Sequence, residues 1–290
     1  METATRDEFL DELSKRNRGL IAADDRRRLA AARFLVAGCG STGGATVEPL
    51  VRAGALRLVL VEPGDYEVSN LNRQRASLEA IGRNKAEWLA EQARRINPHL
   101  EIEAHPSGLS AANAAGLVEG ADLIIDGVDV TTMDGLSAKI VLHEEAARAR
   151  RPVVSAYDLA YRQFIRVYDY RTRPEPMAGR LEAVRRSATP VDALAVLVPW
   201  WAIPLDLVGE IERLLGQPGA SIGQLGCASD LFGALIVPLA IELLAGRPVR
   251  RSFTLDLKDA TLPASRRLGR RALALAGLLR IQLRRRRPAP

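Results

Sequence analysis

Short apolar runs alternate along the chain with longer amphipathic stretches. Most of the runs are apolar at consecutive positions, a pattern typical of strands buried on both faces of a parallel sheet. Strands are predicted at 33–38, 56–61, 101–104, 122–126, 152–156, 164–170 and 252–257. The amphipathic stretches predict helices at 24–32, 46–53, 84–96, 111–118, 137–149, 206–215 and 231–245. The alternation predicts an α/β fold, with a mostly parallel sheet, helices on both faces and a late antiparallel extension.

A cluster of glycines lies between the first predicted strand and the helix that follows it. Gly38, Gly40 and Gly43 fit the pattern G-x-G-x-x-G, in which missing side chains permit a tight turn and close backbone approach to a phosphate. The helix start then offers free N–H groups to the anion. The second strand ends at Glu62, whose carboxylate could bind ribose hydroxyls. The pattern predicts a Rossmann-like nucleotide site, and up to this point it fits an NAD-dependent dehydrogenase equally well.

The composition changes after residue 170. Residues 171–225 hold six prolines and the pair Trp200 and Trp201, which we expect to pack against the protein. We interpret this segment as a crossover that covers the substrate. It separates the N-terminal segment and nucleotide-binding region, residues 1–170, from residues 226–265, which return to the same domain. Residues 266–290 form an arginine-rich tail.

The net charge of +6 belongs to that tail. Nine arginines and no acidic residue lie beyond Ser265, so the rest of the chain is slightly acidic. We interpret the tail as a packing helix with a solvated basic end. The alternative is a tail that binds an anionic partner, such as a membrane surface, a nucleic acid or an acidic protein.

Apolar runs and cysteines limit the protein class further. No stretch reaches about 18 uninterrupted apolar residues, and the charged N-terminus lacks a signal core, which predicts a cytoplasmic protein without a transmembrane segment. The two cysteines, Cys39 and Cys227, lack the spacing of a zinc site, so no structural zinc is expected. We expect Cys227, at the start of a core helix, to be a small buried thiol.

A dense polar block follows the second strand and points away from a dehydrogenase. It ends in Ser-Asn-Leu-Asn-Arg-Gln at 69–74, and three further motifs stand in order with it: Asn17-Arg18, Gly-Arg-Asn-Lys at 82–85, and Asp126-Gly-Val-Asp129. On these motifs the chain resembles the ThiF and MoeB-like adenylyltransferases of the ubiquitin-activating (E1) type. The resemblance covers about residues 14–257.

The residues of these motifs also suit adenylation on chemical grounds. A carboxylate that attacks the α-phosphorus of ATP must approach another anion, so cations and a metal ion should cluster at the site. Arg73 and Lys85 are suitable phosphate cations. Asp129 follows a parallel strand and could hold magnesium. Asn70 and Gln74 can hydrogen-bond phosphate oxygens or the loop.

The resemblance assigns roles to these residues. It implies that Glu62 binds the ribose, that Asn70, Arg73 and Lys85 bind the phosphates, and that Asp129 holds Mg²⁺. Ser41 stands where relatives often have a further glycine, and it belongs with the glycine loop in the nucleotide site. It also implies a homodimer in which Arg18 reaches the γ-phosphate bound by the neighbouring subunit.

The resulting prediction is an ATP-dependent adenylyltransferase. It would activate a carboxylate, expected to be the C-terminus of a small ubiquitin-like or sulfur-carrier-like protein or a peptide, as acyl-AMP with release of pyrophosphate. Residues 171–225 contain no cysteine, so no enzyme thioester is expected. Two alternatives are a noncatalytic E1-like scaffold subunit and an NAD-dependent oxidoreductase, although no hydride-transfer His or Tyr-x-x-x-Lys pair is evident.

Overall fold

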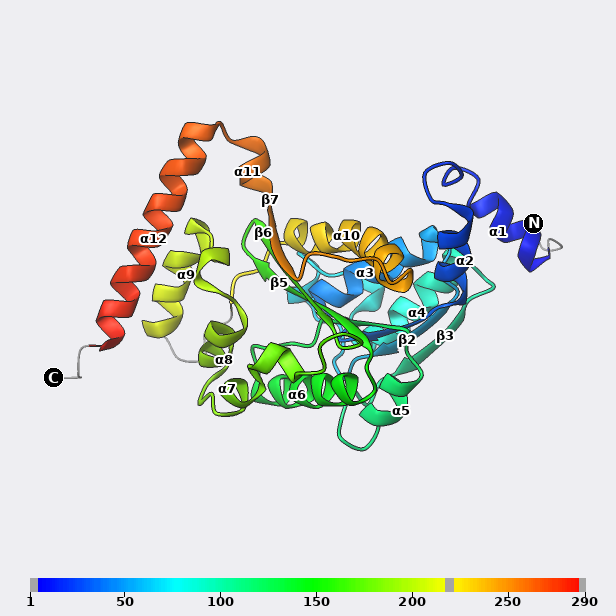
Figure 1. The fold of residues 1–290 in the computed structure, drawn as a ribbon, viewed down its shortest axis with the longest axis horizontal. Helices are drawn as coiled ribbons and strands as arrows, with labels where there is room; N and C mark the ends of the chain where they lie inside the picture. The colour runs from blue at the N-terminus through cyan, green and yellow to red at the C-terminus, as the bar shows by residue number, and fades with distance from the viewer. Residues whose placement is uncertain (1–4, 217–221, 287–290) are drawn as a thin grey trace.

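The computed structural model describes residues 5–216 and 222–286. They form a seven-stranded sheet in the order β3-β2-β1-β4-β5-β6-β7 (Figure 1). The strands are β1 Arg33–Ala37, β2 Arg57–Val61, β3 Glu101–His105, β4 Leu123–Asp126, β5 Pro152–Leu159, β6 Arg162–Asp169 and β7 Ser252–Asp256. Strands β1 to β5 are parallel, and β6 and β7 extend the sheet in antiparallel pairs. The predicted fold class is confirmed.

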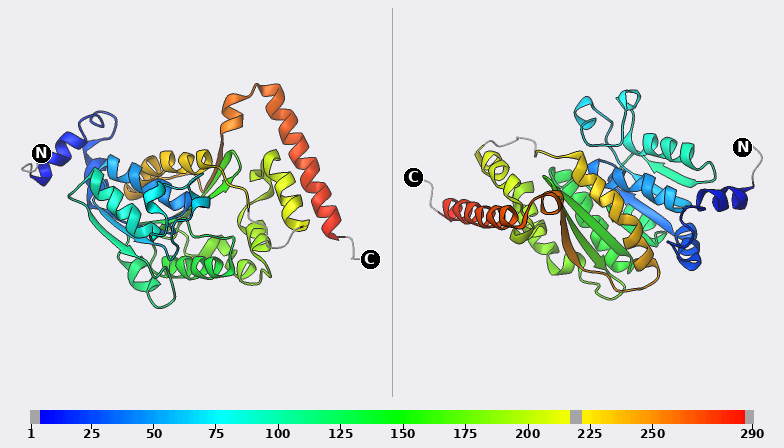
Figure 2. Two further views of the ribbon diagram at one scale, coloured as in Figure 1. Left: turned by 180° about the vertical axis from the view of Figure 1, so that it is seen from behind. Right: turned by 90° about the horizontal axis from the view of Figure 1, so that it is seen from above.

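Helices cover both faces of the sheet (Figure 2). One face packs against α2 Ala23–Ala31, α3 Ser41–Ala53, α4 Lys85–Ile96 and α10 Gly226–Leu244. The other packs against α5 Ala114–Glu119, α6 Met133–Arg148, α7 Leu181–Arg185 and α8 Pro190–Leu197. Helix α1 Arg6–Leu13 lies at the N-terminal end, and short turns of 3₁₀ helix are η1 Val68–Asn70, η2 Leu78–Ala80, η3 Pro176–Gly179 and η4 Trp200–Ala202. Because the central strands are buried on both faces, only their ends are free to form a site.

Helix α10 is apolar and long enough to cross a membrane by length and composition. In the structure it packs on α3, with Phe232 and Ile236 fully buried. The two helices approach closely at Gly233, where a Cβ would lie 2.6 Å from the carbonyl oxygen of Ala45. In this fold α10 is a helix of the protein core.

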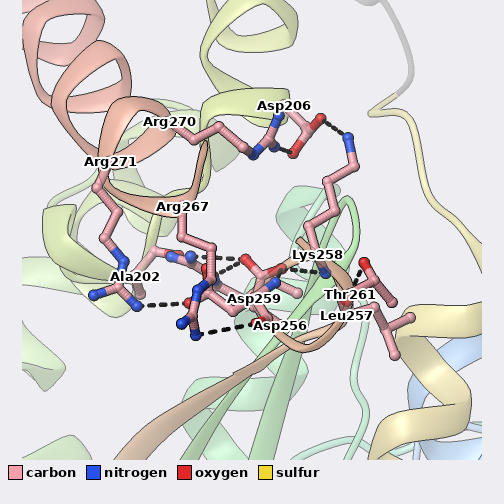
Figure 3. Close-up of polar contacts among 11 residues, drawn as sticks. Ala202, Asp206, Asp256, Leu257, Lys258, Asp259, Thr261, Arg267, Arg270 and Arg271 are labelled. Atoms are coloured by element: carbon pink, nitrogen blue, oxygen red, sulfur yellow. Dashed lines mark hydrogen bonds and ion pairs between the residues drawn. The ribbon is translucent and has the colours of Figure 1, made fainter. Parts of the chain in front are cut away.

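Three helices near the end of the chain stand beside the sheet (Figure 1). They are α9 Leu205–Gly216, α11 Leu257–Thr261 and α12 Ala264–Arg286. Arg270 of α12 and Lys258 of α11 both bond to Asp206 of α9, and Arg271 donates to Asp259 at 2.6 Å (Figure 3). Part of the basic tail is therefore neutralised by acids of the same chain, as in a packing helix. The anionic partner of the tail stays a prediction.

Three elements differ from their predicted bounds in ways that shape the site. Helix α3 begins at Ser41 instead of 46, so the end of the glycine motif forms its first turn. Helix α6 begins at Met133 instead of 137, where the Thr132 side chain caps it. Strand β5 continues to Leu159 instead of 156, because β6 still pairs with it after β4 has ended.

The crossover segment contains η3, α7, α8, η4 and α9. The expectation that Trp200 and Trp201 are packing residues is wrong for Trp200, which is 65% exposed. Trp201 is 45% exposed and contacts the ring of Phe164 edge-on, with 5.7 Å between centroids. Both indoles lie on η4, a single turn at the surface that has no room to bury two large rings. The domain boundaries within the chain stay a prediction.

Candidate active site

Three glycines join the turns that follow β1 and β4. Gly38 has a φ of +84°, and a Cβ there would lie 2.3 Å from the carbonyl oxygen of Gly127. A Cβ on Gly43 would lie 1.9 Å from the carbonyl oxygen of Gly38, and one on Gly127 would lie 2.6 Å from the Gly43 nitrogen. Because no side chain fits at any of these contacts, only glycine permits this junction.

The start of α3 is open to an anion. Its N-cap residue is Gly40, no side chain caps the helix, and the first turn contains no acidic residue. The first N–H groups of a helix have no partner within the helix and carry its positive dipole end. This 13-residue helix therefore presents unused donors at the carboxyl edge of the sheet.

A cavity of about 430 Å³ opens at this edge. It brings together most of the predicted site residues, which come from the ends of three strands and the block after β2. Those that line it are Gly40, Ser41, Glu62, Arg73, Gln74, Lys85 and Asp129. The prediction that these distant motifs share one site agrees with this geometry, while their roles in binding stay predictions.

Glu62 links two turns through its carboxylate. Oε2 accepts a 2.8 Å hydrogen bond from the backbone N–H of Cys39, and Oε1 accepts a 3.0 Å bond from Gly64. The carboxylate thus fixes the glycine turn against the turn after β2. It also lines the cavity, where the predicted ribose contact would place it.

Arg73 and Lys85 are two cations that line the cavity. Arg73 donates to the side chains of Gln224 and Asn72 and to the carbonyl oxygen of Ser69, at 2.5, 2.9 and 2.9 Å. Lys85 begins α4, which the Asn84 side chain caps. Neither residue makes an ion pair with any other residue in the part of the chain that the structure describes. Both face the cavity with their charge available.

The two carboxylate oxygens of Asp129 have different surroundings. Its Oδ1 accepts hydrogen bonds from the backbone N–H and the hydroxyl of Thr131, each at 2.8 Å. This is the local turn that an aspartate favours. The residue also lines the cavity, and its second carboxylate oxygen has no hydrogen bond to the described residues. Across residues 5–216 and 222–286, no three His, Cys, Asp or Glu side chains are arranged to hold a metal ion.

A buried charged cluster supports the strand end that carries Asp129. Asp126 is fully buried and bonds to Lys139, to the Ser155 hydroxyl and, at 3.0 Å, to His143 Nε2. Burial would raise the pKa of Asp126, but Lys139 and His143 outweigh it and hold the pKa below its ordinary value. Burial lowers the pKa of His143, which also contacts the Tyr170 hydroxyl at 2.7 Å. His143 is therefore a buried structural residue.

Four predicted residues do not line the cavity. Gly38 and Gly43 lie behind it in the glycine junction. Asn70 is buried, and its Oδ1 accepts from the backbone N–H of Glu67 at 3.1 Å, so it shapes the loop that carries Arg73. Arg18 is paired with Asp11 at 3.1 Å, and its neighbour Asn17 contacts the end of α3 opposite the cavity. Within one subunit, Arg18 is remote from the nucleotide site.

Asp158 was missed in the sequence because β5 was predicted to end before it. Its carboxylate accepts a 2.9 Å hydrogen bond from the Ser41 hydroxyl, and it lines the cavity. With the Gln163 amide turned so that its nitrogen faces Asp158, that nitrogen donates to Oδ1 at 2.7 Å. Burial raises the pKa of Asp158 to about 6 despite these hydrogen bonds. The sequence did contain a signal for the longer strand, because apolar and polar residues alternate at Tyr157, Asp158 and Leu159.

The two cysteines differ in exposure. Cys39 is buried, and burial raises the pKa of its thiol. Cys227 is exposed at the start of α10, so the expectation of a buried thiol is wrong. Cys227 is on the outer side of the first turn of α10, whereas the next two residues, Ala228 and Ser229, are buried.

The fold and the cavity define a Rossmann-like α/β protein with an uncapped helix start and two cations at the carboxyl edge of its sheet. The chain belongs to the ThiF family, whose model matches residues 14–267. This confirms the family predicted from the motifs and sets aside the NAD-dependent oxidoreductase.

Curated relatives include the mouse "Adenylyltransferase and sulfurtransferase MOCS3", 34% identical over 165 residues, which are 55% of this chain and 35% of that protein. "Adenylyltransferase and sulfurtransferase UBA4" of Yarrowia lipolytica is 29% identical over 50% of this chain and 36% of its own length. The matched region therefore spans only about a third of the length of each of these relatives.

Solved structures share the fold over most of the chain. PaaA has a TM-score of 0.64 with 18% identity and covers 89% of this chain and 82% of its own. E. coli tRNA N6-threonylcarbamoyladenosine dehydratase, TcdA, solved with ATP, has a TM-score of 0.58 with 19% identity. The match covers 84% of this chain and 98% of TcdA. E. coli MccB, also solved with ATP, has a TM-score of 0.56 with 15% identity. The match covers 80% of this chain and 62% of MccB.

Proposed function

We propose that this protein is an ATP-dependent adenylyltransferase that activates a carboxylate as acyl-AMP. The observation that carries the proposal is the pairing of the uncapped start of α3 with Arg73 and Lys85, two cations that make no ion pair among the described residues. Membership of the ThiF family and the similarity to proteins named adenylyltransferases support it.

The residues present suit each change of the reaction. A carboxylate oxygen forms a bond to the α-phosphorus, the bond from that phosphorus to the bridging oxygen breaks, and pyrophosphate leaves with the electron pair. Charge grows on the leaving oxygens, where a guanidinium and an ammonium stabilise it most. Arg73 and Lys85 supply these groups, and the N–H groups of α3 hold the remaining phosphate oxygens.

Magnesium fits the charge balance of the cavity. Three carboxyl groups line it, on Glu62, Asp129 and Asp158, against the two cations, so a triphosphate needs further positive charge. The free oxygen of Asp129 is a suitable ligand, and phosphate oxygens and water would complete the coordination that Mg²⁺ prefers. When bound, the ion would neutralise phosphate charge.

The proposal extends to partners. The substrate would be the C-terminus of a small ubiquitin-like protein or a peptide, and the protein would act in the cytoplasm as a homodimer. The position of Arg18 at the far end of α3 supports action in the neighbouring subunit, since it is remote from its own cavity. The absence of cysteine from 171–225 supports direct transfer of the acyl group from acyl-AMP to an external nucleophile.

ATP–pyrophosphate exchange tests the proposal. Purified protein, Mg²⁺, ATP and labelled pyrophosphate are incubated with carboxylate or peptide pools, and label entering ATP is measured. Exchange that depends on the carboxylate is expected. ATP binding by calorimetry without any exchange would favour the second candidate, a noncatalytic scaffold.

A further inference from the structure

The cavity has a second part whose side chains include none of the residues assigned to the phosphates. Beyond the polar end, its lining passes to the helices of the crossover segment and to α12. The side chains there are aliphatic. Those that matter most are Leu194 of α8, Val198 just after it, Ile211 and Leu214 of α9, and Leu278 and Ile281 of α12. We call this part the aliphatic arm. All charged residues that line the cavity belong to its polar end.

The arm is enclosed by a packed arrangement of helices. Gly277 lets α12 lie close to α9, since a Cβ there would lie 2.5 Å from Cγ1 of Val208. Arg270 and Asp206 pair across the same two helices (Figure 3). Ile281 is 8% exposed, so its side chain faces the interior of this packing. Packed helices therefore form part of the wall of the arm, while Ala195, which also lines it, remains exposed.

The position of the arm limits what can occupy it. If the phosphates lie at the start of α3, the carboxylate that attacks them must also lie at the polar end. The rest of the acyl group must then extend away from the phosphates, and the cavity continues into the arm. Apolar pockets bind ligands mainly by removing apolar surface from water, and a peptide that ended in glycines would bring no side chain to fill this space.

We infer that the acyl substrate carries a large aliphatic group next to its carboxylate, and that the arm binds this group. The inference rests on the proposed adenylation and names the substrate class for it. The same chemistry has two sources, a free alkyl carboxylic acid or a peptide whose last residues are leucine, isoleucine or valine. Either source places alkyl carbons in the arm and the carboxylate beside Arg73 and Lys85.

A substrate series tests the inference by pyrophosphate exchange. Acetate, hexanoate and decanoate are compared, together with short peptides that end in Gly-Gly or Leu-Leu. Each methylene that enters the arm is expected to raise kcat/KM by about fourfold until the arm is full. The better of decanoate and the Leu-Leu peptide identifies the source. Equal activity along the alkyl series together with preference for the Gly-Gly peptide would overturn the inference and leave adenylation intact.

Matched variants locate the binding in the arm. Leu278→Asp places a charge in the arm, whereas Leu279→Asp changes the next residue of α12, which is 51% exposed. Ala195→Trp fills the arm without a buried charge, in case Leu278→Asp fails to fold. We expect Leu278→Asp and Ala195→Trp to lower kcat/KM for the aliphatic substrate at least tenfold and Leu279→Asp to leave it within twofold. Equal effects of Leu278→Asp and Leu279→Asp, with unchanged activity in Ala195→Trp, would refute the inference.

A binding measurement separates this inference from the proposed function. The fluorescent fatty acid cis-parinarate is titrated into the full-length protein without ATP. Saturable binding that Ala195→Trp removes and Leu279→Asp retains supports the arm, even if no carboxylate gives exchange and adenylation itself fails. Absence of saturable binding, in a protein that exchanges pyrophosphate with Gly-Gly peptides, contradicts the arm alone.

Discussion

Arg73 and Gln224 lie 151 positions apart, yet Arg73 Nε donates a 2.5 Å hydrogen bond to Gln224 Oε1. The bond ties the loop after β2 to the end of the crossover segment. It holds the guanidinium at the cavity without neutralising it, because an amide has no charge. The crossover segment thus helps to position Arg73, the proposed phosphate cation.

This contact gives the first prediction. Arg73→Ala should lower kcat/KM for exchange about a hundredfold, since loss of one preorganised charge partner costs on the order of 3 kcal/mol. Gln224→Ala should act less, within about tenfold, mainly through KM for ATP, because the guanidinium remains but is held less firmly. Arg75→Ala is the control, since Arg75 is exposed and pairs with Asp230. An equal loss in the Arg75 variant would contradict the assignment.

The second prediction separates two roles at the polar end. Lys85→Ala should abolish most exchange at every Mg²⁺ concentration, whereas Asp129→Ala should raise the Mg²⁺ concentration for half-maximal exchange about tenfold or more. Both variants should keep the unfolding midpoint of the wild type within a few degrees, with exposed Lys15→Ala as control. Near-native exchange in both variants would refute the site.

The third prediction concerns pH and Asp158. Its pKa is about 6 in the folded protein, above the ordinary 3.8, because burial disfavours the charged form. The proton bound in the fold therefore stabilises the protein fully below pH about 4, and this stabilisation is lost as pH rises through 6. Asp158→Asn should exceed the wild type in free energy of unfolding by up to about 3 kcal/mol at pH 7.5, and the gain should shrink toward pH 4.

Urea unfolding at several pH values measures this difference. Asp134→Asn, on the exposed surface of α6, is the control. A gain for Asp158→Asn that is equal at pH 4 and pH 7.5 would show that the carboxyl does not titrate as inferred.

The fourth prediction concerns the thiols. Cys227→Ser should leave exchange within twofold of wild type, because the exposed side chain holds no part of the core. Intact mass spectrometry of the wild type with ATP and substrate should show no adduct that reducing agent removes. A substrate thioester on Cys227 would overturn direct transfer from acyl-AMP.

The fifth prediction tests Arg18 in a dimer. Arg18→Ala and Lys85→Ala should each be inactive, and mixing them should restore activity, because each mixed dimer then has one site with both cations. With random exchange, half of the dimers are mixed, so up to about a quarter of wild-type activity should return. Native mass spectrometry must show that mixed dimers form. Mixed dimers without activity, or a fully active Arg18→Ala protein, would exclude the role.

The sequence allowed prediction of the sheet, because parallel strands appear as apolar runs and the motifs follow their ends. The same logic brought Glu62, Arg73, Lys85 and Asp129 into one cavity. Asp158 escaped because its strand continues past its last parallel partner, and helical periodicity does not reveal where Cys227 meets the surface.

The aliphatic arm was beyond sequence reasoning for a different reason. Its walls come from α8, α9 and α12, which are far apart in the chain. Periodicity shows that a helix has an apolar face, but not whether that face meets another side chain or a cavity. The arm therefore needed three-dimensional coordinates to be found.

The contact among Gly38, Gly43 and Gly127 also determines where this protein could be redesigned. No larger residue is tolerated there, so a change at the junction would separate the phosphate loop from the turn before Asp129. Altered substrate choice should instead be sought in the helices of the crossover segment, which can vary in shape while the reacting end stays the same. Laboratory evolution for new acyl groups would then enrich substitutions in α8 and α9 and leave the three glycines untouched.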